Sequence, residues 1–219
     1  YLSDYLRTKN IENNHIYIKE LEDLYEDGFV KINNFFNNYE HNKILQLFDE
    51  KLSNKLSNNS DIASYQIEDK KINDMLYEKF SFFENILFGK KLKKQRYILK
   101  QIAVSDNKSP YKDSTHWHQD RFIPCFKLLY FPTSVTTNPF EYLKGSHFID
   151  KQYLKNALIS ASGTTGSEDL NESLNFEGYK RETFYVKDNT LIIAATSGFH
   201  RRYNENKDGV RKYITVGYY

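Results

Sequence analysis

The sequence predicts a mainly β protein with some α structure, a cupin-like jelly roll of two sheets with N-terminal helices packed on one of them. Helical patterns occupy the first 90 residues, short strand-like runs fill most of the remainder, and turn residues separate those runs. The length of 219 residues suits one fairly large domain with an ample core. We therefore expect a single domain over 1–219, with a helical support region over 1–90 and a jelly-roll core over 91–219.

The first 90 residues contain three helical patterns and one strand. Residues 17–27 predict a short helix that ends at Gly28, and residues 29–32 alternate like a strand. Asn37 and Asn38 are good N-caps for the next helix. Its apolar residues recur at every fourth position: Ile44, Phe48, Leu52 and Leu56. The third helix carries one apolar stripe, made of Ile72, Met75, Leu76, Phe80, Phe83 and Leu87.

The second part of the chain predicts the sheets. Seven runs alternate or are continuously apolar: 97–104, 115–120, 126–131, 140–143, 182–186, 190–195 and 211–218. Turn residues such as Asn138-Pro139 and Lys187-Asp188-Asn189 separate them. Residues 151–181 are rich in Gly, Ser and Thr and have little periodicity. We therefore expect a long loop over 151–181 that acts as a mobile lid near the functional site.

Composition argues against several classes of function. The net charge is only +2, from 31 basic and 29 acidic residues, which gives no reason to expect a nucleic-acid or membrane partner. The sequence has no apolar run of membrane-spanning length. Its single cysteine, Cys125, has no partner for an intrachain disulfide, which suits a reducing compartment. We therefore expect a cytoplasmic protein.

A compact metal-ligand pattern stands at residues 115–120, Thr-His-Trp-His-Gln-Asp. Alternate side chains of a strand share a face, so His118 and Asp120 would converge on one point. His200, which follows an apolar run, is well placed to be a third ligand. Two histidines and one carboxylate on one face of an octahedral ion are typical of non-haem Fe(II) oxygenases. A pair of His116 and His118 is an alternative, although we rank His116 as a structural residue.

Four segments and one arginine, in order along the chain, carry a family resemblance. The segments are Asp27-Gly28-Phe29-Val30, Trp117-His118-Gln119-Asp120, the stretch from Asn138 to His147 with its Gly-Ser-His turn, and the stretch from Thr190 to His200. Arg211 follows them. Together they resemble the phytanoyl-CoA dioxygenase-like family of Fe(II)/2-oxoglutarate-dependent oxygenases. His147 belongs, by this resemblance, to the structural turn and not to the metal.

The resemblance implies a double-stranded β-helix in which His118, Asp120 and His200 hold Fe(II). The co-substrate 2-oxoglutarate would chelate the metal and meet Arg211 with its distal carboxylate. With O₂, such an enzyme hydroxylates an unactivated C–H of a small molecule and releases succinate and CO₂. Radical halogenases of the same family have Gly or Ala in place of the carboxylate ligand. The presence of Asp120 therefore favours hydroxylation or a related oxidation.

Two further residues are candidate contacts to the co-substrate. Arg202 stands two residues after the distal histidine, where the family often has a small hydroxyl residue. Gln101, or its neighbour Lys100, is a possible polar contact from an earlier strand.

The strand predicted to carry Arg211 has two different faces. Arg211, Tyr213 and Thr215 share one face, whereas Ile214 and Val216 share the other. For Arg211 to reach the site, its face must line the interior between the sheets. We therefore expect Ile214 and Val216 to pack outward, under the helices.

Two other functions compete with this interpretation. The first is a non-catalytic cupin-like module that binds a metal or a sugar. Such a module has no need of Arg211, so affinity for 2-oxoglutarate separates the two. The second is a scaffold domain, derived from an oxygenase and kept for its surface. The intact set of predicted ligands argues against a scaffold.

Overall fold

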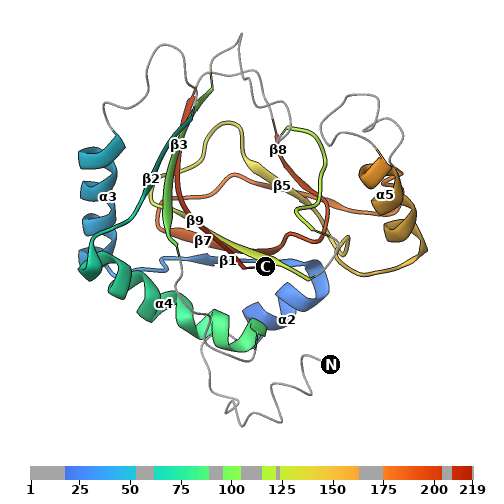
Figure 1. Cartoon of the computed structure of the whole chain (residues 1–219), viewed down its shortest axis with the longest axis horizontal. Helices are drawn as coiled ribbons and strands as arrows, with labels where there is room; N and C mark the ends of the chain where they lie inside the picture. Colours follow the sequence, from blue (N-terminus) through green and yellow to red (C-terminus); the bar gives the residue numbers. More distant parts are fainter. Residues whose placement is uncertain are drawn as a thin grey trace.

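The computed structural model describes residues 18–52, 62–88, 96–104, 115–121, 124–162, 175–203 and 209–218. They form two antiparallel sheets, with helices packed outside the larger sheet (Figure 1). The predicted mainly β architecture with two sheets is confirmed. Among the described helices, none combines the length and apolar character that a membrane span requires.

The larger sheet has six strands and the smaller sheet has three. The order in the larger sheet is β1 (Phe29–Asn33), β7 (Thr190–Ala195), β4 (Phe126–Phe131), β9 (Gly209–Tyr218), β3 (Ile98–Val104) and β2 (Ile62–Gln66). The order in the smaller sheet is β6 (Arg181–Phe184), β5 (Phe140–Leu143) and β8 (His200–Arg202). Strands far apart in sequence are thus neighbours in both sheets, which places the C-terminal strand β9 between β4 and β3.

Three helices support the larger sheet: α2 (Ile18–Asp27), α3 (Asn38–Leu52) and α4 (Lys70–Phe88). The predicted cap of α3 is present, because the Glu40 N–H donates to Asn37 Oδ1 (3.0 Å) and the Asn37 N–H donates to Glu40 Oε2 (3.1 Å). This reciprocal pair is a capping box that satisfies two backbone donors. Leu56, predicted to extend the stripe of α3, lies outside the described residues.

The two faces of the larger sheet belong to different apolar clusters. On β4, Leu128 and Tyr130 pack with the helices, while Leu129 and Phe131 face the smaller sheet. On β9, Ile214 and Val216 join the helix-side cluster, and Tyr213 packs on the cluster between the sheets. The predicted orientation of the strand that carries Arg211 is therefore confirmed.

The predicted loop over 151–181 is wrong at its start, because residues Lys151–Ser162 form the helix α5. Asp150 begins this helix: its Oδ1 accepts a hydrogen bond from the Tyr153 N–H (2.6 Å). Tyr153 is buried, but Leu154 and Leu158 are 52% and 72% exposed. The apolar residues therefore do not mark one buried face, and the usual helical periodicity is missing from the sequence. Residues 163–174, in the middle of the predicted lid, lie outside the described residues, and residues 175–180 contain no helix or strand before β6 begins at Arg181.

Other boundaries also differ from the prediction. Residues 115–120 do not form a strand; among them only His118 makes an isolated bridge, with His200. The strands β2 and β8 were not predicted. The sequence of β8 is His-Arg-Arg, so it has no apolar alternation from which a strand could be inferred.

Gly28, where α2 ends, offers a test of the packing between the helices and the smaller sheet. Its φ is +84°, and an added Cβ would lie 2.5 Å from both His147 Nδ1 and Tyr142 Oη. Gly178 has a similar φ of +87°, but an added Cβ there would meet nothing within 4 Å. We expect Gly178→Ala to lose about 1–2 kcal/mol of unfolding free energy, since only backbone strain is added. Gly28→Ala should lose about 1–3 kcal/mol more from overpacking.

Urea unfolding midpoints of the two variants measure this difference. Equal losses in Gly28→Ala and Gly178→Ala would contradict the close packing of Gly28 against β5.

Candidate metal centre

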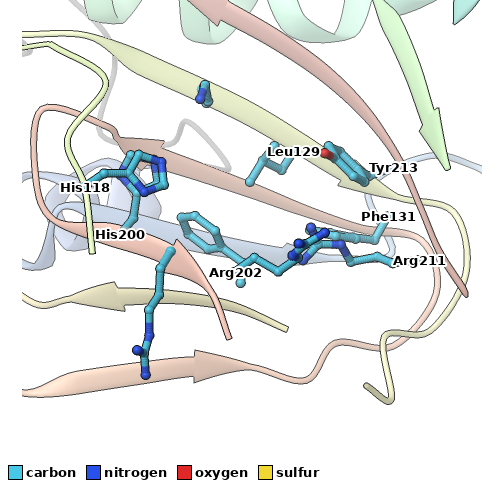
Figure 2. A pocket seen from close by; sticks show the side chains of 10 residues that line it. His118, Leu129, Phe131, His200, Arg202, Arg211 and Tyr213 are labelled. Carbon is cyan, nitrogen blue, oxygen red and sulfur yellow. The ribbon is translucent and has the colours of Figure 1, made fainter. Parts of the chain in front are cut away.

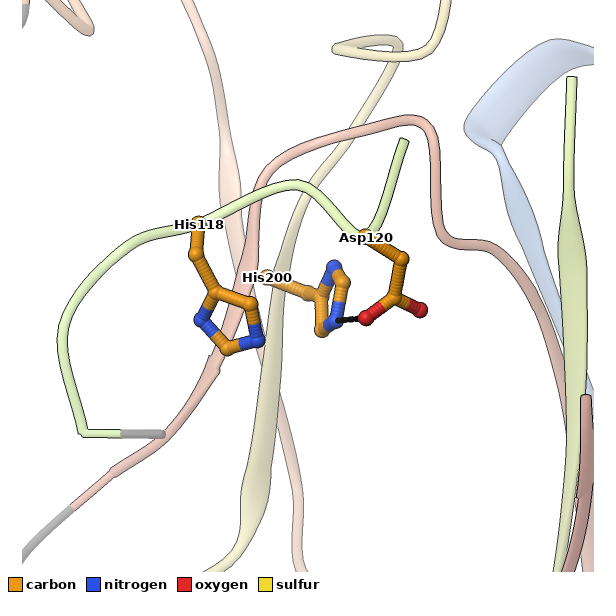
Figure 3. Close-up of side chains that lie close together, drawn as sticks. All are labelled: His118, Asp120 and His200. Atoms are coloured by element: carbon orange, nitrogen blue, oxygen red, sulfur yellow. Dashed lines mark ion pairs between the residues drawn. The ribbon is translucent and has the colours of Figure 1, made fainter. Parts of the chain in front are cut away.

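The backbone brings the two predicted histidine ligands together from segments far apart in the chain. The His118 N–H donates to the His200 carbonyl and the His200 N–H donates to the His118 carbonyl, both at 3.0 Å. Two residues further, the Asp120 N–H donates to the Thr196 carbonyl (2.9 Å). The segment around 118–120 is therefore fixed along the turn that leads from β7 into β8, and the three side chains gather on one side of it (Figure 3).

The side chains of His118, Asp120 and His200 present their donor atoms as a compact cluster. One ligand atom from each residue lies within 4.8 Å of the others. His200 Nε2 is 3.8 Å from Asp120 Oδ1, and the two imidazole centroids are 4.4 Å apart. His200 is only 4% exposed, while the other two side chains are half-buried. Among the described residues, this is the one group of acidic, His or Cys side chains with such spacing.

The hydrogen bonds of both imidazoles fix their tautomers. His118 Nδ1 lies 2.8 Å from the His116 carbonyl oxygen, and His200 Nδ1 lies 3.0 Å from the Gly198 carbonyl oxygen. A carbonyl oxygen only accepts, so each Nδ1 must carry the proton and donate it. Each Nε2 is then left with a lone pair that is available to a metal. Such an outer hydrogen bond is typical of metal-ligating histidines.

Burial and charge set the protonation states of the cluster. Burial, together with the neighbouring His118, lowers the pKa of His200 to about 3, so this imidazole is neutral near pH 7. Burial alone would raise the pKa of Asp120, but His200 and the ammonium of Lys127 outweigh it and hold the pKa of that carboxyl below its ordinary value. The cluster therefore offers the neutral imidazole of His200 and the carboxylate of Asp120, the forms in which these groups bind a metal.

Lys127 is a member of the site that the sequence analysis missed. Its Nζ donates to Asp120 Oδ1 at 2.8 Å. The signal was present in β4, because Lys127 alternates with Leu129 and Phe131, and all three line the same cavity. A lone lysine in an otherwise apolar strand indicates a charged function inside the sheets.

A cavity between the two sheets runs from the histidines to a group of cations. It has a volume of about 110 Å³. Figure 2 shows its lining residues, which are His118, Lys127, Leu129, Phe131, Phe140, His200, Arg201, Arg202, Arg211 and Tyr213. No carboxylate is among these described lining residues. The cavity has apolar walls, and its polar positions other than the two histidines and Tyr213 are lysine and arginine, which suits a small anion.

Arg211 is placed in this cavity by β9 and is 9% exposed. Its Nη1 donates to the Asn138 carbonyl (2.9 Å), but its buried Nε has no acceptor among the described residues. Burial lowers the pKa of Arg211, yet a guanidinium keeps its proton in proteins. An unsatisfied buried donor on a charged group is costly, and an anion in the cavity would satisfy it.

The structure does not bring Gln101 to this site. On β3, Gln101 pairs with Lys212, whose Nζ reaches Asp49 of α3 at 3.1 Å. This pair therefore lies on the helix side of the sheet. Lys100 pairs with Tyr213, on the cavity side. The expectation that Gln101 contacts the co-substrate is thus contradicted, because its register along β3 points it to the opposite face.

The Gly-Ser-His turn supports the cluster without joining it. Ser146 Oγ accepts a hydrogen bond from the Phe199 N–H (2.8 Å), directly beside His200. His147 Nε2 donates to the Tyr25 carbonyl (2.9 Å), and His147 is not part of the donor cluster. His116 contributes its carbonyl to the His118 hydrogen bond, and its own ring is likewise outside the cluster. Among the described residues, neither histidine ring contributes a donor atom to the cluster.

Sequence comparisons give no match, neither with models of protein families nor with curated proteins. Comparison with solved structures does. HygX from Streptomyces hygroscopicus with nickel and 2-oxoglutarate bound is 12% identical, with a TM-score of 0.59 over 91% of this chain and 85% of that chain. The non-haem alpha ketoglutarate-dependent carbocyclase SnoK from nogalamycin biosynthesis is 14% identical, with a TM-score of 0.63 over 96% and 84%.

The epimerase SnoN from the same biosynthesis, also non-haem and alpha ketoglutarate-dependent, is 14% identical, with a TM-score of 0.62 over 91% of this chain and 81% of that chain. These matches confirm the expected double-stranded β-helix. The chain has the fold of non-haem iron, 2-oxoglutarate-dependent oxygenases and presents a His-Asp-His triad within it.

Proposed function

We propose that this protein is an Fe(II)- and 2-oxoglutarate-dependent oxygenase that hydroxylates a small molecule. One observation carries the proposal. A single cavity is lined by both histidines of the His-Asp-His cluster, each with its Nδ1 bound to a backbone carbonyl, and, away from them, by the buried Arg211 with an unsatisfied donor. The cluster can bind a metal and the arginine can bind an anion. 2-Oxoglutarate is an anion that can bind the metal at one end and the arginine at the other.

The residues of the cluster fit Fe(II). His118, Asp120 and His200 would hold it as a facial triad, which leaves positions open on the ion. Lys127 keeps the Asp120 carboxylate ionised and oriented. The carbonyls of His116 and Gly198 fix the two imidazoles, so little reorganisation is needed when the metal binds.

The residues of the cavity fit 2-oxoglutarate. Arg211 would receive the distal carboxylate, since a planar guanidinium offers paired donors that match a carboxylate. When bound, the metal and 2-oxoglutarate supply the oxidation of an unactivated C–H by O₂, with release of succinate and CO₂. Leu129, Phe131 and Phe140 exclude water from the space between the two anchors.

Two comparisons support a small-molecule substrate. HygX has been solved with hygromycin B bound, and SnoN has been solved with Fe³⁺, alpha ketoglutarate and nogalamycin RO. Enzymes of this fold include a carbocyclase and an epimerase, so the fold alone does not choose the reaction. Asp120 completes the triad and so favours hydroxylation over halogenation, and we retain the resemblance to the phytanoyl-CoA dioxygenase-like family as part of the proposal. The free, buried Cys125 suits the cytoplasm.

The alternative is a module that binds a metal or a sugar without turnover. The buried Arg211 argues against it, because a cation with an unsatisfied donor is costly in a module that has no anion to bind. An anaerobic spectrum of the Fe(II)-loaded protein separates the two functions. We expect a charge-transfer band when 2-oxoglutarate is added, followed by succinate release on exposure to O₂. A protein that binds Fe(II) but gives neither band nor succinate would be a binding module.

We predict that each of the variants His118→Ala, Asp120→Ala and His200→Ala loses tight Fe(II) binding, because two remaining ligands do not hold the ion. Anaerobic Fe(II) titration measures this loss, and release of succinate without substrate should disappear with it. His116→Ala is the matched control, since it keeps the backbone carbonyl that orients His118. If His116→Ala lost Fe(II) while His118→Ala kept it, the ligand assignment would be wrong by two residues.

We predict that Arg211→Ala weakens 2-oxoglutarate binding by about 2–5 kcal/mol, because it leaves the distal carboxylate buried without its charged partner. Arg211→Lys should recover only part of this loss, since an ammonium lacks the fork of paired donors. Titration of the Fe(II) charge-transfer band measures both affinities. Val210→Ala, a change at the exposed neighbour on β9, should leave the affinity unchanged. An unaltered affinity in Arg211→Ala would remove Arg211 from the co-substrate site.

A further inference from the structure

Two buried guanidinium groups, and not one, lie in the part of the cavity away from the triad. Arg202 comes from β8 in the smaller sheet, and Arg211 comes from β9 in the larger sheet. They are 5% and 9% exposed and line the same cavity. In Figure 2 their side chains reach towards one another from opposite sides.

The register of β8 explains why Arg202 enters the cavity. His200 and Arg202 are two residues apart on this strand and therefore share a face. Arg201, between them, also borders the cavity, but its guanidinium is held towards the other face: its Nε donates to the buried Glu141 carboxylate (2.7 Å), and the group lies 4.5 Å from the centre of the Trp117 ring. These two contacts fix the phase of the strand, so Arg202 is directed to the same side as the metal ligand.

The two buried cations favour an anion between them. Like charges in a buried cavity repel one another, and burying either cation disfavours its charged form. No carboxylate is among the described lining residues, and the buried Nε of Arg211 has no acceptor among the described residues. One anionic group bound between the two cations would relieve their repulsion and would also accept the free Nε–H of Arg211.

A carboxylate fits between them. Its two oxygens offer about four lone-pair sites, so it can accept hydrogen bonds from two guanidinium groups at once. The separation along the strand also fits, because residues two apart on β8 are about 7 Å apart. A five-carbon 2-oxo acid that reaches the metal beside His200 can extend its distal carboxylate over that distance to Arg202.

We propose that Arg202 is a second co-substrate contact, which together with Arg211 clamps the distal carboxylate from both sheets. Arg202 thereby sets the preference for dicarboxylic over monocarboxylic 2-oxo acids. The inference rests on the proposed function, because it assumes that a 2-oxo acid binds the metal. It adds a selectivity that one arginine alone would provide more weakly.

The test compares 2-oxoglutarate with 2-oxopentanoate, which has the same carbon chain without the distal carboxylate. Both acids are titrated anaerobically into the Fe(II)-loaded protein, and the ratio of their dissociation constants is the readout. Arg202→Gln should reduce the preference for 2-oxoglutarate by about 10-fold to 100-fold, the range expected when a hydrogen-bonded charge is removed. Arg202→Lys should fall between the wild type and Arg202→Gln, since it keeps the charge but not the fork.

The ratio distinguishes a specific role from a folding defect. Damage to the metal site or to the sheet would weaken the binding of both acids alike and leave the ratio of their dissociation constants unchanged. Arg181→Gln is the matched control: it removes an exposed arginine from the same sheet, and we expect it to keep the wild-type ratio. If the wild type binds 2-oxoglutarate but Arg202→Gln keeps the same ratio of dissociation constants, the role of Arg202 is overturned and the proposed function still stands. A wild type that binds neither acid would instead overturn the proposed function.

Discussion

The reciprocal backbone hydrogen bonds between His118 and His200 are the constraint on which the rest of the site depends. The two residues are more than eighty positions apart in the sequence. Bringing such distant segments together costs loop-closure entropy, which opposes folding. The two bonds of 3.0 Å fix the spacing of the backbones, and each imidazole is then oriented by a carbonyl of its own segment. The donor set is therefore shaped before any metal arrives.

This backbone pair is stable because the turn that carries His200 is held from several sides. The Tyr142 hydroxyl donates to the Ala195 carbonyl (2.8 Å), Ser146 Oγ accepts from the Phe199 N–H (2.8 Å), and Gln119 Nε2 donates to the Ser197 carbonyl (2.5 Å). The donors and acceptors come from β5, from the Gly-Ser-His turn and from the residue between the two other ligands. Because these groups are buried, losing any of them would leave an unsatisfied partner.

Much of the fold was predictable because its strands alternate between an apolar helix side and the cavity side. The orientation of β9 followed from the spacing of Arg211 and Ile214, and the structure agrees. No comparable pattern marks the elements whose packing is not apolar: β8 has only polar residues, and α5 exposes Leu154 and Leu158. Gln101 was predicted to contact the co-substrate because it is polar. It lies on the helix side of the sheet, where it pairs with Lys212 of the adjacent strand β9.

The cations of the cavity explain why the space between the sheets is not an ordinary core. Phe131 and Phe140 belong to the apolar cluster between the sheets and also line the cavity. Beside them, Lys127, Arg202 and Arg211 place positive charge, and burying such charge opposes folding. Lys127 is offset by Asp120 within the protein, whereas the free donor of Arg211 is not offset by any described residue. The stability of this cavity is therefore coupled to binding, since an anion that binds only the folded state stabilises it.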